Sequence, residues 1–424
     1  MRVFPEKQSY KFDNNSRVKP FWELMQASGT AGCLLWFHPV FLAIISRQRD
    51  IEEYATVDRS ALLQIGFVCV CAVYLAFAVS PYKRGLPKIL FRPPLIYFLI
   101  YVGICALSSI WSIYPLYTVW RSFECLVFLL LITVALDNLR RFPEDIVEWI
   151  VGRVFLSACC SLIVQRTWII SVISGGLTFQ SMRHNGLLGI LDVGPVLFLA
   201  LFISKRKLVK YFLLVLCAIS ASTRIYIGFV IGLFCGQMSS PRKQLPMVSF
   251  ILGIAVLLIL LVGTTAVVQG FFVGKSEGEY DTGRIHLWRS LLELGMESPL
   301  IGKGFCVGER AATIEEGSPI YQSHNSLFAA FMGCGLLGLA PMILFFFSMV
   351  KLSLKQKVRP AWRTGLVASV VMATFISMFG CSAGGRVYGS WISVVCLAAL
   401  VTSLATPKMN LYGLHQNSNQ KGGS

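Results

Sequence analysis

Charged residues are scarce in this chain of 424 residues. Only 14% are Asp, Glu, Lys or Arg, whereas 55% are hydrophobic and the mean hydropathy is +0.67. A soluble globular domain carries about 25% charged residues, so this composition excludes that class. A membrane-spanning helix needs about 20 consecutive apolar residues. We therefore predict an all-α polytopic membrane protein with about twelve transmembrane helices, forming a single membrane domain over residues 1–424. The predicted spans are 28–46, 61–80, 94–113, 116–136, 146–165, 186–204, 208–223, 225–239, 246–270, 325–350, 362–383 and 387–406.

Several sequence signatures are also missing. There is no glycine-rich P-loop, which argues against hydrolysis of a cytoplasmic nucleotide. The thirteen cysteines show no C-x-x-C spacing typical of a metal site, and most lie in apolar stretches where a thiol packs as a small hydrophobe. The long polar segment described below has neither a D-x-D motif nor a histidine cluster. We expect no metal and no cofactor.

The positive charge is unevenly distributed. The formal net charge is +17, and 24 of the 38 Lys and Arg residues fall in segments that are cytoplasmic if the N-terminus is inside. Twelve fall in segments on the other side. By the positive-inside rule, both termini are predicted to be cytoplasmic. The segment 270–325 is then extracytoplasmic, and its five basic and eight acidic residues make it net negative. A nucleic-acid partner is therefore not expected.

Residues 271–324 form a predicted extracytoplasmic loop between two spans, and a loop of this length usually carries function. Within it, Arg284–Glu297 is predicted to be an amphipathic helix, with Asp281 or Thr282 as its N-cap. One face carries Ile285, Trp288, Leu291, Leu292 and Met296. Pro299 and the glycines that follow it end the helix. Such a helix is expected to lie along the membrane interface and to roof a cavity between the spans.

His324 is the strongest candidate for a catalytic residue. It stands at the outer edge of a predicted span, beside Asn325. Histidine titrates near neutral pH, so it suits proton transfer to or from a sugar hydroxyl. The structural alternative is an interfacial histidine that only hydrogen-bonds a loop carbonyl.

Three arginines and one aspartate are further candidates. Arg284 begins the loop helix, where its charge opposes the helix dipole, and Arg224 lies at an outer turn between two spans. A guanidinium at either position can bind a phosphate with two hydrogen bonds, although a solvated or snorkelling arginine is the structural alternative. Arg121 lies within a span, where an ion pair with Glu124 explains it equally well. Asp192 is also intramembrane, and serves either as a relay or as a partner for the helix backbone.

Several motifs resemble those of the O-antigen ligase and polymerase family of membrane glycosyltransferases. The motifs are TGRIHLW, PLIGKGF and SHNSLFAAFMGCGLLGL, in this order and ahead of an apolar span. LSSIWSIYPL followed by Arg121, and STR ending at Arg224, resemble the upstream motifs of the family. The resemblance covers residues 105–350. The chain departs from the family at Thr223, which stands where a serine commonly precedes the arginine.

The resemblance implies transfer of an undecaprenyl-pyrophosphate-linked glycan to a sugar hydroxyl, with inversion at the anomeric carbon and without a metal. It implies that Arg284 and Arg224 hold the pyrophosphate, that Arg121 assists, and that His324 orients or deprotonates the acceptor. Asn325, Trp288 and Asp192 are expected to support the site.

The resemblance further implies a bacterial inner membrane location. The expected partners are the lipid-linked glycan, a glycan or lipid A core acceptor, membrane lipid and polysaccharide assembly proteins. Ligase and polymerase activities both stay open. The alternatives from other classes are a lipid-linked oligosaccharide flippase or other polysaccharide transporter, and a non-catalytic member of an assembly complex.

Overall fold

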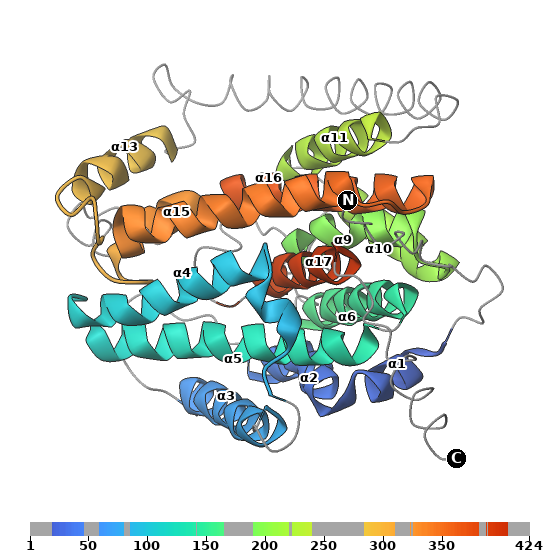
Figure 1. Ribbon diagram of the computed structural model, residues 1–424, viewed down its shortest axis with the longest axis horizontal. Helices are drawn as coiled ribbons and strands as arrows, with labels where there is room; N and C mark the ends of the chain where they lie inside the picture. Colours follow the sequence, from blue (N-terminus) through green and yellow to red (C-terminus); the bar gives the residue numbers. More distant parts are fainter. Residues whose placement is uncertain are drawn as a thin grey trace, which may run out of the picture.

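The computed structural model describes residues 19–45, 59–79, 85–140, 142–164, 190–219, 223–239, 284–309, 323, 325–380, 387 and 389–405. At 45, 190–192, 218–219, 223–224 and 284–287 it describes the backbone but not the side chains. All regular structure in these described ranges is helical (Figure 1). The predicted all-α class is therefore confirmed.

The helix boundaries follow the predicted spans closely. The first half of the chain contains α1 (Phe21–Ala27), α2 (Gly29–Ile45), α3 (Arg59–Ala78), the 3-10 helix η2 (Lys88–Phe91), α4 (Leu95–Leu107), the 3-10 helix η3 (Ser108–Ile110), α5 (Pro115–Leu139) and α6 (Pro143–Val164). The second half contains α9 (Ile190–Phe202), α10 (Lys207–Ile219), α11 (Thr223–Met238), α13 (Arg284–Gly295), α15 (Ser326–Lys355), α16 (Pro360–Gly380) and α17 (Gly389–Ala405).

Many of these helices have the length and composition of membrane spans. Among the described residues, five helices are long and apolar enough to cross a membrane, namely α3, α5, α6, α15 and α16. Five shorter apolar helices correspond to the predicted spans at α2, α4, α9, α11 and α17. The span predicted at 208–223 forms α10, which carries two lysines in its first turn. The span predicted at 246–270 lies outside the described residues. The chain is thus a polytopic membrane protein, and the total of twelve spans stays a prediction.

Local sequence explains where several helices begin. Pro115 and Pro143 occupy the first turns of α5 and α6, where the missing N–H of proline leaves no hydrogen bond unmade. Glu144 and Asp145 follow in the first turn of α6, where acidic side chains favour the positive end of the helix dipole. Asn325 caps α15 by accepting hydrogen bonds from the next helical N–H groups.

The helices form a bundle around α17 (Figure 1). Most of α17 is fully buried, and it packs against α4, α5, α6, α9, α15 and α16. α16 forms a second axis, because α9 and α11 both pack along it. α3 lies at the edge, against α2 and α5. α13 lies at one end of the bundle, beside the start of α15 (Figure 1). We call that end the loop end.

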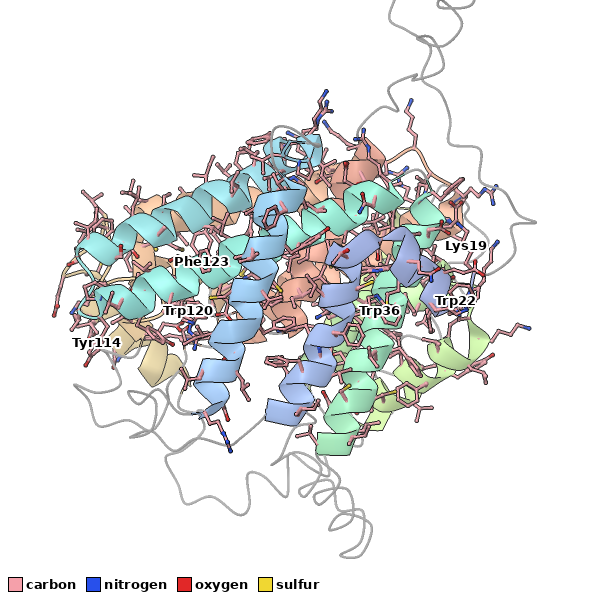
Figure 2. All side chains as sticks on the ribbon, turned by 90° about the horizontal axis from the view of Figure 1, so that it is seen from below. Lys19, Trp22, Trp36, Tyr114, Trp120 and Phe123 are labelled. Carbon is pink, nitrogen blue, oxygen red and sulfur yellow. The ribbon has the colours of Figure 1, made fainter. Side chains whose placement is uncertain are left out.

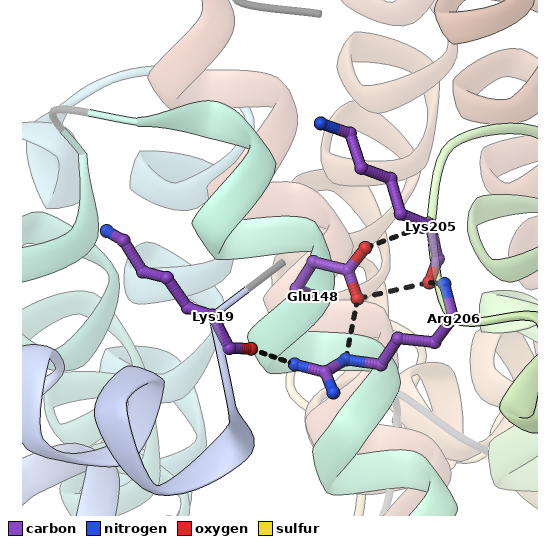
Figure 3. A network of polar contacts seen from close by, with 5 residues as sticks. Lys19, Glu148, Lys205 and Arg206 are labelled. Atoms are coloured by element: carbon purple, nitrogen blue, oxygen red, sulfur yellow. Dashed lines mark hydrogen bonds and ion pairs between the residues drawn. The ribbon is translucent and has the colours of Figure 1, made fainter. Parts of the chain in front are cut away.

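The opposite end is held together by a polar network around Glu148 (Figure 3). Its carboxylate accepts hydrogen bonds from Ser204 Oγ at 3.1 Å, from the backbone N–H of Lys205 at 2.7 Å and from Arg206 Nε at 3.0 Å. Arg206 also donates to the carbonyl of Lys19 and lies 3.6 Å from the ring centroid of Phe21. This network fixes the α9–α10 turn and α1 onto α6.

α1 is a helix that the sequence analysis did not predict, since residues 1–24 were expected to be a polar inside segment. Its seven residues include Leu24, which is fully buried, and Trp22, which is exposed. Trp22 and Tyr114 lie toward opposite ends of the bundle (Figure 2), and each is more than half exposed. Amphipathic aromatic side chains at both ends are typical of the two membrane interfaces.

Candidate functional site at the loop end

The PLIGKGF motif is bonded to α15 through main-chain groups. Two of the carbonyls just after α13 accept hydrogen bonds from α15, and two N–H groups further on donate to it. The pairs are Leu336 N to Pro299 O at 2.8 Å, Leu337 N to Leu300 O at 3.2 Å, Lys303 N to Met332 O at 2.9 Å and Gly304 N to Gly333 O at 2.9 Å. The sequence predicts only that this motif ends the loop helix, whereas the motif also fixes the loop to the next span. α13 itself ends at Gly295, two residues before the predicted end at Glu297.

Glycines make this close contact possible. A Cβ atom on Gly302 would lie 2.6 Å from the backbone nitrogens of Cys334 and Gly335, and Gly302 has a φ of 68°. Gly335 has a φ of 60° and a non-helical conformation inside α15. The kink at Gly335 directs the N–H groups that follow it toward the carbonyls of the loop instead of their own helix. The GCG of the third motif therefore serves as a docking place for the second motif.

The other side of the same loop is bonded to η3, to Trp111 just after it, and to α5. Trp111 Nε1 donates to the carbonyl of Ile301 at 3.0 Å. The N–H of Phe305 donates to Ser108 Oγ at 3.0 Å, and Thr118 Oγ1 donates to the carbonyl of Phe305 at 3.2 Å. The upstream motif LSSIWSIYPL thus supplies Ser108 and Trp111, and Thr118 follows shortly after it. Three motifs that are distant in sequence meet at the loop end of the bundle.

Arg121 lies one turn of α5 beyond Thr118. Its Nη1 donates to Glu124 Oε2 at 2.8 Å, and its guanidinium lies 5.1 Å from the ring centroid of Tyr117. Gln64 of α3 donates to the other oxygen of Glu124 at 3.0 Å. Among the described residues, the buried Nε of Arg121 has no hydrogen-bond partner. The predicted ion pair with Glu124 is therefore present, and the guanidinium keeps an unused donor.

The two neighbours of His324 are tightly held, while His324 itself lies outside the described residues. Glu309 accepts hydrogen bonds from the N–H of Ser323 at 3.3 Å and from its hydroxyl, and Trp288 Nε1 donates to the carbonyl of Ser323 at 2.9 Å. Asn325 Oδ1 accepts from the N–H groups of Leu327 and Phe328 at 2.8 and 3.2 Å. The chain therefore enters and leaves position 324 through fixed residues.

α13 packs onto α15 through its apolar face. Leu291 is fully buried and clusters with Phe331 and Met332, and Trp288 stacks on Phe328 with ring centroids 5.6 Å apart. The predicted amphipathic helix is thus present, and its apolar face covers the beginning of α15. Arg284 is the first residue of α13, and its side chain lies outside the described atoms.

The other two candidates are placed by their helices alone. Arg224 is the second residue of α11, and Asp192 is the third residue of α9. Because α9 ends beside Ser204 in the network opposite the loop end, its first residues point toward the loop end. α11 runs along α16 with Gly228 beside Phe375, and Phe379 lies near Trp288 of α13, so the start of α11 with Arg224 also lies toward the loop end. Their side-chain roles stay predictions.

Three side chains at this end escaped the sequence analysis. Gln64 is a single amide in an apolar stretch, and Glu309 is an ordinary acidic residue in a polar loop. Ser323 is the first residue of the SHNSLFAAFMGCGLLGL motif, but the motif alone assigns it no role. Each is revealed only by its partner, since a buried polar side chain needs a hydrogen bond from elsewhere in the fold.

Residues 208–343 match the model of the O-antigen ligase family. This part of the chain is similar to the O-antigen ligase family. The resemblance stated from the motifs is thereby confirmed, and the match lies inside the predicted range 105–350. It includes the positions of Arg224, Arg284 and His324 but not those of Arg121 and Asp192. A comparison with curated proteins gives no match. The match suggests a function of the O-antigen ligase or polymerase type.

Proposed function

We propose that this protein transfers a glycan from undecaprenyl pyrophosphate to a sugar hydroxyl at the outer face of a bacterial inner membrane. The acceptor oxygen attacks the anomeric carbon and forms the new glycosidic bond with inversion. The bond from that carbon to the pyrophosphate oxygen breaks, and undecaprenyl pyrophosphate leaves. The proton of the acceptor hydroxyl passes to His324.

The contacts of one loop are the main support for this proposal. The loop from Pro299 to Phe305 binds α5 on one side and α15 on the other, so it joins the helix of Arg121 to the helix that begins beside His324. A glycosyl transfer from a lipid pyrophosphate needs both a cation for the departing charge and a proton acceptor for the hydroxyl. The contacts of this loop supply the framework for bringing the two together.

The arginines have the chemistry that the leaving group requires. Charge develops on the pyrophosphate as its bond to the sugar breaks, and a guanidinium can bind the phosphate oxygens with two parallel hydrogen bonds. Arg284 at the start of α13 and Arg224 at the start of α11 take this role, with Arg121 assisting. Side chains that neutralise the pyrophosphate directly make the reaction independent of a metal ion.

The basic residues support a cytoplasmic position for the end opposite the loop. Lys19, Lys205 and Arg206 gather there around Glu148 (Figure 3), and Arg140 at the end of α5 lies at the same end. An excess of Lys and Arg on one side marks the cytoplasmic face of a membrane protein. The loop end then faces outward, where a lipid-linked glycan awaits transfer, and both termini are cytoplasmic.

Analysis of surface glycan in a deletion strain tests this function and separates its two forms. Single repeat units left unpolymerised identify a polymerase, whereas full-length chains retained on the carrier lipid identify a ligase. His324→Ala and Arg284→Ala are then expected to leave the deletion phenotype uncorrected, although each protein accumulates in the membrane. Full correction by both variants would contradict the proposal and favour a non-catalytic assembly protein.

A further inference from the structure

We infer that Gln64 of α3 is a positioning residue for substrate binding, because it restrains Glu124 and so keeps one side of the Arg121 guanidinium available to a phosphate. This inference rests on the proposed function for the identity of the ligand. Its own basis is the relay from Gln64 through Glu124 to Arg121, which links two helices 60 residues apart in the sequence.

The two carboxylate oxygens of Glu124 accept hydrogen bonds from different side chains. Oε2 accepts from Arg121 Nη1 at 2.8 Å, and Oε1 accepts from Gln64 Nε2 at 3.0 Å. A carboxylate and a guanidinium commonly form two parallel hydrogen bonds, which would use both oxygens. Here the second oxygen is occupied by the amide of Gln64. The ion pair is therefore limited to one contact.

Arg121 has a hydrogen-bond donor that the ion pair with Glu124 does not use. An arginine has five N–H donors and no acceptor. Within the part of the chain that the structure describes, its Nε is buried and has no hydrogen-bond partner, while the side chain of Glu124 is 2% exposed and that of Arg121 is 14% exposed. A buried N–H without an acceptor is unfavourable, and a phosphate oxygen would satisfy it. Such a ligand would use the side of the guanidinium that includes Nε.

Arg121 lies close to the loop that contains Phe305. Thr118, one turn before Arg121, donates a hydrogen bond to Phe305, which belongs to the loop that reaches α15. Arg121 thus lies directly beneath a segment bonded to the helix that begins beside His324. A phosphate bound there would lie next to the proposed acceptor site.

The restraint on Glu124 comes from α3, a helix at the edge of the bundle. α3 packs against α5 beside Trp120 and Phe123, which are labelled in Figure 2. Its buried residues are Val68, Cys71 and Leu75, so its apolar contact with the bundle is small. A hydrogen bond between polar side chains is one of the few interactions that can orient such a helix within lipid. Gln64 therefore sets both the position of α3 and the state of Glu124.

The experiment compares binding of undecaprenyl pyrophosphate in detergent by purified wild-type protein, Gln64→Met, Arg121→Gln and the double variant. Gln64→Met keeps the side-chain length and leaves the ion pair intact, and Arg121→Gln removes the guanidinium while keeping an amide donor for Glu124. Without Gln64, the second oxygen of Glu124 can close onto Nη2, the nitrogen that shares the Nε side of the guanidinium, and compete there with the ligand. We expect Gln64→Met to weaken binding about fivefold, the effect of one hydrogen bond, and to add nothing in the Arg121→Gln background.

Cys71→Ala is the matched control, because it removes a buried side chain from the same face of α3 without touching the relay. It should leave the affinity unchanged. An unchanged affinity in Gln64→Met would overturn the inference, and so would an equal loss in both backgrounds or in Cys71→Ala. Failure of the wild type to bind this lipid would overturn it together with the proposed function. Binding with the expected pattern but without transfer of glycan to an acceptor would overturn the proposed function and leave the inference standing.

Discussion

The indole of Trp288 donates a hydrogen bond across 2.9 Å to the carbonyl oxygen of Ser323. Trp288 belongs to α13, the helix that begins with Arg284, and Ser323 directly precedes His324. The same indole ring stacks on Phe328 in the first turn of α15. One side chain thus links the helix of the proposed phosphate-binding arginine to the backbone next to the proposed base. The hydrogen bond and the stacking can be separated by mutation.

Trp288→Phe is expected to reduce the rate constant of transfer about tenfold, because it removes the N–H but keeps an aromatic ring against Phe328. The carbonyl of Ser323 then loses its donor, and the backbone before His324 loses a restraint. Thermal stability should change little. The measurement is initial transfer rate together with the melting temperature in detergent. Trp22→Phe at the opposite end is the control, and equal rates for both variants would refute the positioning role.

Gly302→Ala is expected to destabilise the protein by about 2–4 kcal/mol. A side chain there requires an unfavourable positive φ, and its Cβ would meet the backbone of α15 at 2.6 Å. Gly103→Ala in α4 is the matched control, since a Cβ at that position meets nothing within 4 Å. It should be neutral or slightly stabilising, because alanine favours a helix. Equal melting temperatures for the two variants in detergent would contradict the described contact between loop and helix.

Glu148→Gln is expected to lower the free energy of unfolding by about 1.5–3 kcal/mol, because the carboxylate accepts a charged hydrogen bond from Arg206. The variant that remains folded should keep the wild-type catalytic efficiency, since Glu148 lies at the end opposite the candidate site. Lys207→Gln, an exposed change on the neighbouring helix, should alter neither quantity. Loss of transfer without loss of stability would mean that Glu148 acts on the site itself.

Removal of metal ions is expected to leave the transfer rate within about twofold of its starting value. The proposed guanidinium groups neutralise the pyrophosphate directly, so no divalent ion is needed for the leaving group. The measurement compares purified protein in excess chelator with protein supplied with Mg²⁺. A rate that disappears with the chelator and returns with Mg²⁺ would require a different mechanism.

Local sequence patterns predicted the helices well. α13 begins at Arg284 as expected from its amphipathic pattern, and α15 begins at Ser326 after the cap at Asn325. Periodicity and capping act over a few residues, which is why a single sequence reveals them. The seven residues of α1 were missed, since a helix of two turns has too short a pattern to recognise.

The contacts that build the site could not be predicted in the same way. The hydrogen bond between Gln64 and Glu124 joins residues 60 positions apart, and Trp111 meets Ile301 across 190 positions. The local sequence around Gln64 does not indicate its hydrogen-bond partner, because the packing of α3 on α5 determines which residue that is. The kink at Gly335 is a similar case, because its role in binding the loop becomes visible only from the hydrogen bonds between the two segments.

Transfer by the purified protein in detergent, without any gradient, tests the central claim most directly. The reaction contains undecaprenyl-pyrophosphate-linked glycan and its acceptor, and its products are analysed by mass spectrometry and by the configuration of the new linkage. We predict one new inverted glycosidic bond for each undecaprenyl pyrophosphate released, and none with His324→Ala. Movement of the lipid-linked glycan across the membrane of reconstituted vesicles, with no new glycosidic bond under either condition, would contradict the account and identify a transporter.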